Sequence, residues 1–362
     1  MTKLNTTVVC LVILINFDSI FVTAVHPKKL EVHIPLTISP AGHNYAIIQI
    51  GRQKNFRMMF DTGTSLWWVQ SDAVLLSHKV GGTRYNRHTE TRVLRETFEQ
   101  TVGHRQTILT GNIVEDNFII GEAKFQSLSF VEVVGTSESM STDNVYDGVI
   151  GMGKSRGSAF PSLINLMLRC RKIESGVFTF RFCGTRTSET SPFRAVKGDL
   201  VFGNIRTEYS DGPMTHVQIR QSNPWTITVD AIYIDSIPLC SFCVVSIHTG
   251  EPRTTGPKRM IKTILKRLTE TDRENGKIFV RCDLKGIIPT LILQLKGRYF
   301  YIPLTKLMSP RFYSVDGPEC DSGFEIPGEH QDGWIFGLSL LRNFHVAFHE
   351  DAQLLGFARV HC

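Results

Sequence analysis

The sequence has little of what marks several broad classes of protein. Its 40 Lys and Arg residues are nearly balanced by 34 Asp and Glu residues, and the net charge of +6 is spread along the chain. This small excess favours an acidic partner or surface and carries no information on fold. There is no low-complexity tract, no nucleic-acid-binding motif and no interleaving of basic with aromatic residues. We therefore do not expect the protein to bind nucleic acid.

Long hydrophobic runs are missing as well. The run at residues 8–15 is too short to span a bilayer, and no later segment is long and apolar enough either. This run follows Lys3 and precedes small residues at 22–24, which is the pattern of a secretory signal peptide. We predict a signal peptide at residues 1–24 and a mature chain that is secreted to the extracellular space, without a membrane span.

Cysteines are few, and their number is odd once the signal peptide is set aside. The chain has eight, and one of them is Cys10, so seven would remain after secretion. An odd number predicts a free or intermolecular thiol, so we expect a monomer, with a dimer through the unpaired cysteine as the alternative. Cys240 and Cys243 form a CxxC motif without a second pair, which favours a local disulfide over a zinc or redox site.

Helical patterns are scarce, and short apolar runs bounded by Gly, Pro, Asn or Asp predict β-strands along most of the chain. Such runs lie within residues 44–63, 112–121, 127–135, 176–183, 198–204, 225–234, 289–304 and 343–350. Helical periodicity is limited to residues 160–172 and 256–268. The second segment carries Lys258, Arg259, Lys262, Lys266 and Arg267. We interpret these cations as a solvated helix face rather than a binding patch.

An internal repeat divides the chain into two lobes. In "FDTGTSLWWV" an apolar strand leads into Asp61-Thr-Gly, and in "VVSIHTG" a second strand leads into His248-Thr-Gly. The segments "YDGVIGMG" and "GWIFGLSLL" echo each other further along each half. Duplication is the simplest account. The polar segment 185–198 is the best linker candidate, between an N-terminal lobe at 25–184 and a C-terminal lobe at 199–362.

These motifs, in this order, resemble the pepsin-like aspartic protease family (peptidase A1), and the likeness covers almost all of the mature chain. The resemblance implies an all-β, bilobal fold with two β-barrel-like lobes and a substrate cleft between them. It implies no cofactor, and a peptide or protein ligand as the partner in the cleft. His345 and His349 lie on one predicted strand without a third ligand, so no metal site is expected.

The resemblance also bears on the disulfides. By likeness to the family, the C-terminal lobe is expected to contain Cys282–Cys320 and Cys240–Cys243. The pairing of Cys170, Cys183 and Cys362 stays open. Cys183–Cys362 is favoured, because both residues end strands that in the family lie in the sheet between the lobes.

The two loops define the candidate catalytic pair. In the family, two neighbouring carboxyls share one proton, so that one acts as a base and the other as an acid. Here the resemblance places Asp61 in one loop and His248 in place of the second aspartate. We expect attraction to an imidazolium to lower the pKa of Asp61 and to make it a poorer base. We favour His248 as a structural replacement that holds Asp61 by a hydrogen bond over His248 as a catalytic acid, and Asp61 itself is either a working group or a relic.

Other family features are partly kept. Cleft support is expected from Thr62, Gly63 and Thr64 in the first loop and from Thr249 and Gly250 in the second. Gapless matching places His104 where the family has a flap Tyr. The second loop continues as Glu251-Pro252-Arg253, where the family has small hydroxyl and apolar residues.

Two functions follow from this pattern. The first is a secreted, catalytically impaired aspartic protease homologue that acts by binding a ligand in or near its cleft. The alternative is an active aspartic-type endopeptidase that uses an unusual Asp61/His248 pair. The departures favour the first, because a working variant would be expected to keep its flap and its second loop.

Overall fold

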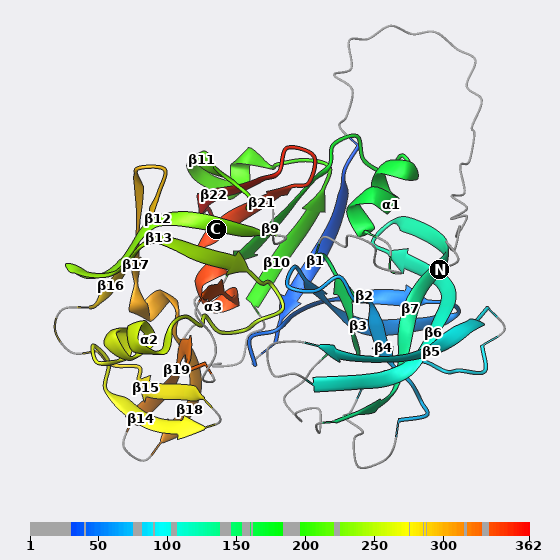
Figure 1. Ribbon diagram of the computed structural model, residues 1–362, viewed down its shortest axis with the longest axis horizontal. Coiled ribbons are helices and arrows are strands. Elements are labelled where there is room, and N and C mark those ends of the chain that lie inside the picture. The colour runs from blue at the N-terminus through cyan, green and yellow to red at the C-terminus, as the bar shows by residue number, and fades with distance from the viewer. Residues whose placement is uncertain are drawn as a thin grey trace, which may run out of the picture.

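A computed structural model gives the structure of the chain (Figure 1). It describes residues 30–39, 41–74, 82–89, 91–102, 107–137, 146–153, 160, 162–183, 196–220, 225–274, 276–284, 286, 288–314, 317–327 and 333–362. Strands dominate these residues and helices are few, which confirms the all-β fold predicted from the short apolar runs. The predicted signal peptide and most of the predicted linker lie outside the described residues.

The largest sheet has 13 strands, in the order β11-β22-β21-β9-β10-β1-β2-β3-β8-β4-β7-β6-β5. Their bounds are β1 Val32–Ile38, β2 Asn44–Ile50, β3 Gln53–Asp61, β4 Trp68–Gln70, β5 Val93–Val102, β6 Thr107–Ile120, β7 Ala123–Thr136, β8 Gly148–Gly151, β9 Val177–Cys183, β10 Val196–Phe202, β11 Ser210–Gln218, β21 Phe344–His349 and β22 Leu354–Val360. Strands from both ends of the chain meet in it: β1 pairs with β10, and β9 with both β10 and β21. One sheet therefore joins the two halves (Figure 1).

Two smaller sheets build the rest of the C-terminal half. The five-stranded sheet has the order β17-β16-β12-β13-β20, and the four-stranded sheet has the order β14-β15-β19-β18. Their bounds are β12 Thr226–Ile234, β13 Ile237–Ile247, β14 Glu270–Glu274, β15 Lys277–Arg281, β16 Thr290–Leu295, β17 Arg298–Pro303, β18 Ser309–Ser314, β19 Gly317–Glu325 and β20 Trp334–Phe336.

The described helices are short. Their bounds are α1 Leu163–Arg169, α2 Lys258–Leu265 and α3 Leu338–Leu341, with 3₁₀ turns η2 Thr207–Tyr209 and η3 Leu304–Lys306. The side chain of Ser162 caps α1 by accepting a hydrogen bond from the backbone N–H of Asn165. Pro257 precedes α2, where its missing N–H has no helical partner to lose. None of the helices in the described part of the chain is long and apolar enough to cross a membrane.

The two halves repeat one arrangement around their loops. In the first half β3 runs parallel to β8, with Asp61 opposite Gly151 at the strand end. In the second half β13 runs parallel to β20, with Ile247 opposite Phe336 just before His248. The backbone N–H of His248 donates to the carbonyl of Phe336 over 3.1 Å. The two echoed sequence motifs thus support equivalent loops, as internal duplication predicts.

Three disulfides lie in the described residues, and they match the expected pairs. These are Cys183–Cys362, Cys240–Cys243 and Cys282–Cys320. Cys170 is disulfide-bonded too, and none of the described cysteines is free. The unpaired thiol was predicted for a chain without Cys10, so it stays a prediction.

Loop length ranks two of these disulfides by their expected effect on stability. Cys282–Cys320 closes 38 residues, whereas Cys240–Cys243 closes three. Because a longer closed loop removes more entropy from the unfolded chain, replacing Cys282 and Cys320 by Ala should lower the free energy of unfolding by about 3–4 kcal/mol. The same change at Cys240 and Cys243 should cost about 1–2 kcal/mol. Urea unfolding without reductant measures both, and equal losses would contradict the ranking.

A histidine is fully buried in the large sheet. His345 on β21 is 0% exposed, its Nδ1 lies 2.8 Å from Ser210 Oγ, and its Nε2 has no hydrogen-bond partner. Burial, with a smaller contribution from Arg181, lowers the pKa of His345 to about 4. The folded protein therefore holds this ring neutral at pH values where the unfolded chain, with an ordinary pKa of about 6.5, takes up a proton.

Acidification should therefore destabilise the fold through His345. Its pKa is lower in the folded state, so its contribution to stability is complete above about pH 6.5 and is lost as the pH falls towards 4. The loss for one such group is at most about 3 kcal/mol. Urea unfolding at pH 7, 6, 5 and 4 should show a shallower decline for His345→Gln than for wild type. His88→Gln, at an exposed histidine, should leave the decline unchanged; parallel curves for all three proteins would show that His345 is not responsible.

Candidate functional site

The two loops are joined by a reciprocal set of hydrogen bonds between their threonines. The hydroxyl of Thr62 donates to the carbonyl of Ile247 over 2.6 Å and accepts from the backbone N–H of Thr249 over 3.1 Å. The hydroxyl of Thr249 donates to the carbonyl of Phe60 over 2.7 Å and accepts from the N–H of Thr62 over 3.1 Å. Both threonines are 1% exposed. The loops therefore meet as a rigid, nearly symmetric pair.

Asp61 is held by backbone groups from both loops. Its Oδ1 accepts hydrogen bonds from the N–H of Gly63 over 2.7 Å and from the N–H of Gly250 over 3.1 Å. Within the described residues, Oδ2 accepts none. The carboxyl is thus fixed by one oxygen, and the other oxygen has no hydrogen bond to protein.

Glycine is required in both loops because each backbone passes close to the side chain of the other loop. A Cβ on Gly250 would lie 2.3 Å from Cγ of Asp61, and a Cβ on Gly63 would lie 2.6 Å from Nδ1 of His248. Both distances are shorter than any carbon could occupy without displacement. His248 therefore faces Gly63 in the way that Asp61 faces Gly250. The structure brings Asp61 and His248 to equivalent positions, as the repeat predicted.

The side chains of Asp61 and His248 are not bonded to each other within the described residues. No hydrogen bond or ion pair joins Asp61 to His248 in the described part of the chain. The expectation that His248 holds Asp61 by a hydrogen bond is therefore wrong. The ring of His248 lies against Gly63, and two backbone N–H groups position the carboxyl of Asp61 without the imidazole.

The expected direction of the Asp61 pKa is also wrong. Burial raises the pKa of Asp61 above its ordinary value, and the negative charge of Glu251 acts in the same direction. The attraction of His248 and the N–H donors of Gly63 and Gly250 act in the opposite direction without overcoming it. Desolvation of the carboxylate thus outweighs the attraction of His248, which makes no hydrogen bond to Asp61 in the described part of the chain.

Two residues of the site were missed from the sequence. Asn44 is fully buried, and its amide donates to the carbonyls of Thr249 over 2.6 Å and Phe60 over 3.2 Å. His43 places Nδ1 3.3 Å from the carbonyl of Gly250, and burial lowers its pKa to about 4. Asn44 is the first residue of β2 and His43 immediately precedes it, and this strand was recognised only by its apolar pattern. Neither residue type nor spacing distinguished them there.

The turn after His248 is built into the surrounding structure. The carbonyl of Glu251 accepts from the N–H of Leu338, and that of Pro252 accepts from the N–H of Ser339. The guanidinium of Arg253 forms an ion pair with Asp321. The backbone of this turn and the side chain of Arg253 are thus fixed in place beside the loop pair.

The remaining predicted site residues divide into two groups. Thr64 stays in the first loop, where its hydroxyl accepts from the N–H of Leu66 and its carbonyl from the N–H of Gly153. The flap candidate, His104, lies outside the described residues. Across the described residues, no group of three or more His, Cys, Asp or Glu side chains could hold a metal ion.

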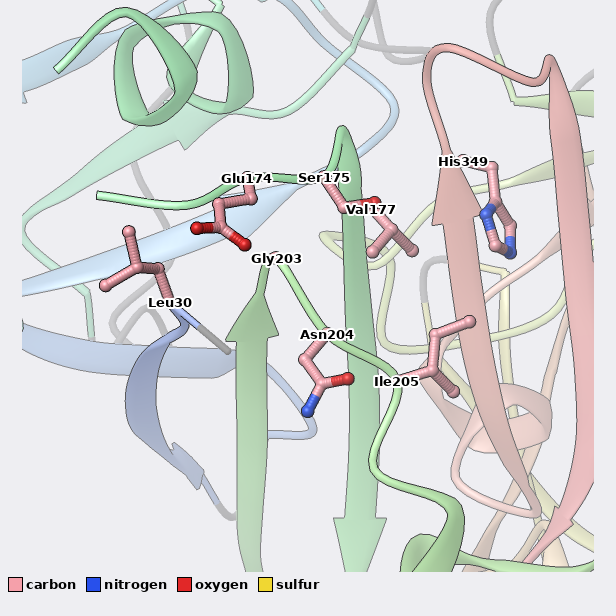
Figure 2. A pocket seen from close by; sticks show the side chains of 8 residues that line it. All are labelled: Leu30, Glu174, Ser175, Val177, Gly203, Asn204, Ile205 and His349. Atoms are coloured by element: carbon pink, nitrogen blue, oxygen red, sulfur yellow. The ribbon is translucent and has the colours of Figure 1, made fainter. Parts of the chain in front are cut away.

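A cavity of about 310 Å³ lies elsewhere in the structure. Its lining residues are Leu30, Glu174, Ser175, Val177, Gly203, Asn204, Ile205 and His349. Figure 2 shows Leu30 and Glu174 on one side of it and Ile205 and His349 on the other. None of these residues belongs to the Asp61 or His248 loop, so the cavity is separate from the loop pair.

The reciprocal threonine bonds, the paired glycines and the duplicated strands define an aspartic protease scaffold. The sequence matches the family described as eukaryotic aspartyl protease over residues 44–360, which is most of the chain. The chain belongs to this family.

Individual relatives agree with that assignment. Cathepsin D of Chionodraco hamatus is 26% identical over 319 residues, covering 84% of this chain and 77% of the relative. Cathepsin D of Gallus gallus is 24% identical over 332 residues, covering 87% of this chain and 80% of the relative. Pepsin A of Bos taurus is 23% identical over 326 residues, covering 85% of this chain and 81% of the relative.

Proposed function

We propose that this family member is a secreted, catalytically impaired aspartic protease homologue that binds a peptide or protein ligand between its lobes. One observation carries the proposal. The two loops are locked together by the threonine bonds, yet the second loop has His248 and no carboxyl at the position equivalent to Asp61, and His248 makes no hydrogen bond to Asp61 in the described part of the chain. The scaffold that positions a ligand is kept, while the shared proton of a carboxyl pair is lost.

Solvent access to the loop pair supports ligand binding there. Gly63 is exposed and lies against the ring of His248, while Asp61 keeps one oxygen without a protein partner. An N–H or O–H group of a bound chain could donate a hydrogen bond to that oxygen of Asp61. The peptide class of ligand comes from the family, whose name and relatives describe proteases.

The alternative is an active endopeptidase in which Asp61 is the base that activates water and His248, as imidazolium, polarises the scissile carbonyl. The unpartnered oxygen of Asp61 favours this alternative, because a base needs a free acceptor. Cleavage that disappears in both Asp61→Asn and His248→Ala is its expected signature.

Binding and cleavage should be measured in the same samples. A fluorescently labelled, alkylated and unfolded protein is incubated with the purified chain between pH 3 and 8. Anisotropy reports binding, and mass spectrometry reports cleavage. Gly63→Val tests the location, since the added Cβ would meet His248, and Gly333→Val is the matched control because its Cβ would meet only the carbonyl of Val244 at 3.8 Å.

We expect intact, bound substrate with wild type and Gly333→Val, and at least about tenfold weaker binding with Gly63→Val. If Gly63→Val unfolds, hydrogen–deuterium exchange of wild type replaces it, with ligand protection expected at residues 58–66 and 245–250. Neither binding nor protection with the unfolded substrate would overturn the proposal. Cleavage that depends on Asp61 and His248 would replace it with the alternative.

A further inference from the structure

Helix α2 presents a row of cations on one side. Lys258, Lys262 and Lys266 stand four residues apart, so they lie nearly above one another with a rise of about 6 Å between neighbours. Arg259 lies on the same side, and all four side chains are exposed. The opposite side, with Ile261 and Ile264, is fully buried. The charge is therefore concentrated on one outward face, which we call the cationic face.

No carboxylate among the described residues forms an ion pair with the cationic face. Arg267, just beyond it, lies 3.6 Å from Asp235. By contrast, the four cations of the face have no ion pair with any described residue. Glu270, on the strand that follows, is already paired with Arg273. An uncompensated row of like charges creates a positive potential that attracts anions.

The helix that carries the row is rigidly seated. Its first turn is closed by hydrogen bonds from the N–H groups of Met260 and Ile261 to the carbonyl of Pro257. A Cβ on Gly256 would lie 2.5 Å from the ring of Trp334, so the chain before the helix packs directly on β20. Figure 1 places α2 in the C-terminal half, between β13 and β15 in this view and away from β2–β7. The row therefore keeps a fixed spacing on the molecular surface.

We propose that the cationic face of α2, which the sequence pattern alone indicated to be a solvated helix face, binds a sulfated polysaccharide. An extended chain with repeated sulfate groups can meet several cations of a row at once, which suits fixed, regularly spaced lysines. A lipid surface fits less well, because the apolar side of α2 is buried in the core and offers nothing to insert into a bilayer. Single-stranded nucleic acid fits less well too, because residues 256–268 include no aromatic side chain on which bases would stack.

The test uses heparin as the sulfated probe and the whole purified chain. The variant Lys258→Gln/Lys262→Gln/Lys266→Gln removes the row while keeping good helix formers. The matched control is Lys54→Gln/Lys124→Gln/Lys306→Gln, which changes the net charge equally at exposed lysines on other elements. Dissociation constants are measured at several NaCl concentrations. Desulfated heparin, vesicles containing anionic phospholipid and an oligothymidine are measured in parallel.

Each cation facing a polyanion contributes a factor of about five in affinity. We therefore expect the α2 variant to bind heparin on the order of 10²-fold more weakly than wild type, with an unchanged melting temperature. The control should lose less than about fivefold, and desulfated heparin should not bind. Equal losses in both variants would reduce the effect to net charge and overturn the proposal. So would wild type that binds vesicles or oligothymidine as tightly as heparin, or that binds none of the probes.

Discussion

In a matched assay at pH 3, the chain should cut an unfolded protein at least about 10²–10⁴ times more slowly than its relative, pepsin A of Bos taurus. That range is the usual effect of losing one positioned acid or base. The measurement is the initial rate of appearance of new amino termini, with equal concentrations of folded protein. Asp61→Asn serves as the control and should abolish any residual rate.

The raised pKa of Asp61 explains part of the expected loss. Burial keeps this carboxyl protonated further up the pH scale, so it is not a base that takes a proton from water in strong acid. The second loop has His248 and no carboxyl at the equivalent position, so the shared proton of a carboxyl pair is not available to Asp61.

Restoring the second carboxyl with His248→Asp should recover only a small part of the rate. The following turn stays as it is, because Glu251 and Pro252 are hydrogen-bonded to α3 and Arg253 is paired with Asp321. The charge of Glu251 would still raise the pKa of Asp61. A wild-type rate within tenfold of pepsin A, lost in both Asp61→Asn and His248→Ala, would show that the Asp/His pair is a working catalyst.

The fold could be predicted from the sequence where local pattern and burial agree. The alternating segment at 225–234 is β12, and the apolar periodicity at 256–268 contains α2. The four-stranded sheet was not foreseen, since β14, Glu270–Glu274, is rich in charged residues, is exposed at 270–273, and has no apolar alternation to mark it. Its strands are held by pairing with β15 and by the Cys282–Cys320 disulfide, which are long-range contacts that a local pattern does not contain.

The candidate site was predictable in its backbone and not in its electrostatics. The repeat of X-Thr-Gly was enough to place Asp61 opposite His248, because duplicated strands bring duplicated loops together. Whether the side chains of Asp61 and His248 form a hydrogen bond depends on their detailed positions in the fold, which the repeat does not determine. The direction of the Asp61 pKa depends on burial, and Asn44 enters the site only through the pairing of β2 with β3. Burial and strand pairing are properties of the folded structure, and the local sequence pattern does not contain them.

Thr62→Val/Thr249→Val should lower the free energy of unfolding by about 4–6 kcal/mol. The change keeps the shape of each side chain but removes four hydrogen bonds between the loops. It leaves the N–H groups of both threonines and the carbonyls of Phe60 and Ile247 buried without these partners. Each such loss costs about 1–3 kcal/mol. The total is expected near the low end of that range, because the carbonyl of Phe60 keeps its hydrogen bond from Asn44. Urea unfolding at pH 7 measures the change.

Thr62→Ser/Thr249→Ser is the matched control, since serine keeps both hydroxyls and removes only a methyl group from each loop. It should cost less than half as much as the valine pair. The single variants Thr62→Val and Thr249→Val should not add, because each removes bonds in which the other residue takes part. If the valine and serine pairs unfold alike, the hydroxyls do not hold the loops together. The scaffold on which ligand binding is proposed would then lack the rigidity assigned to it.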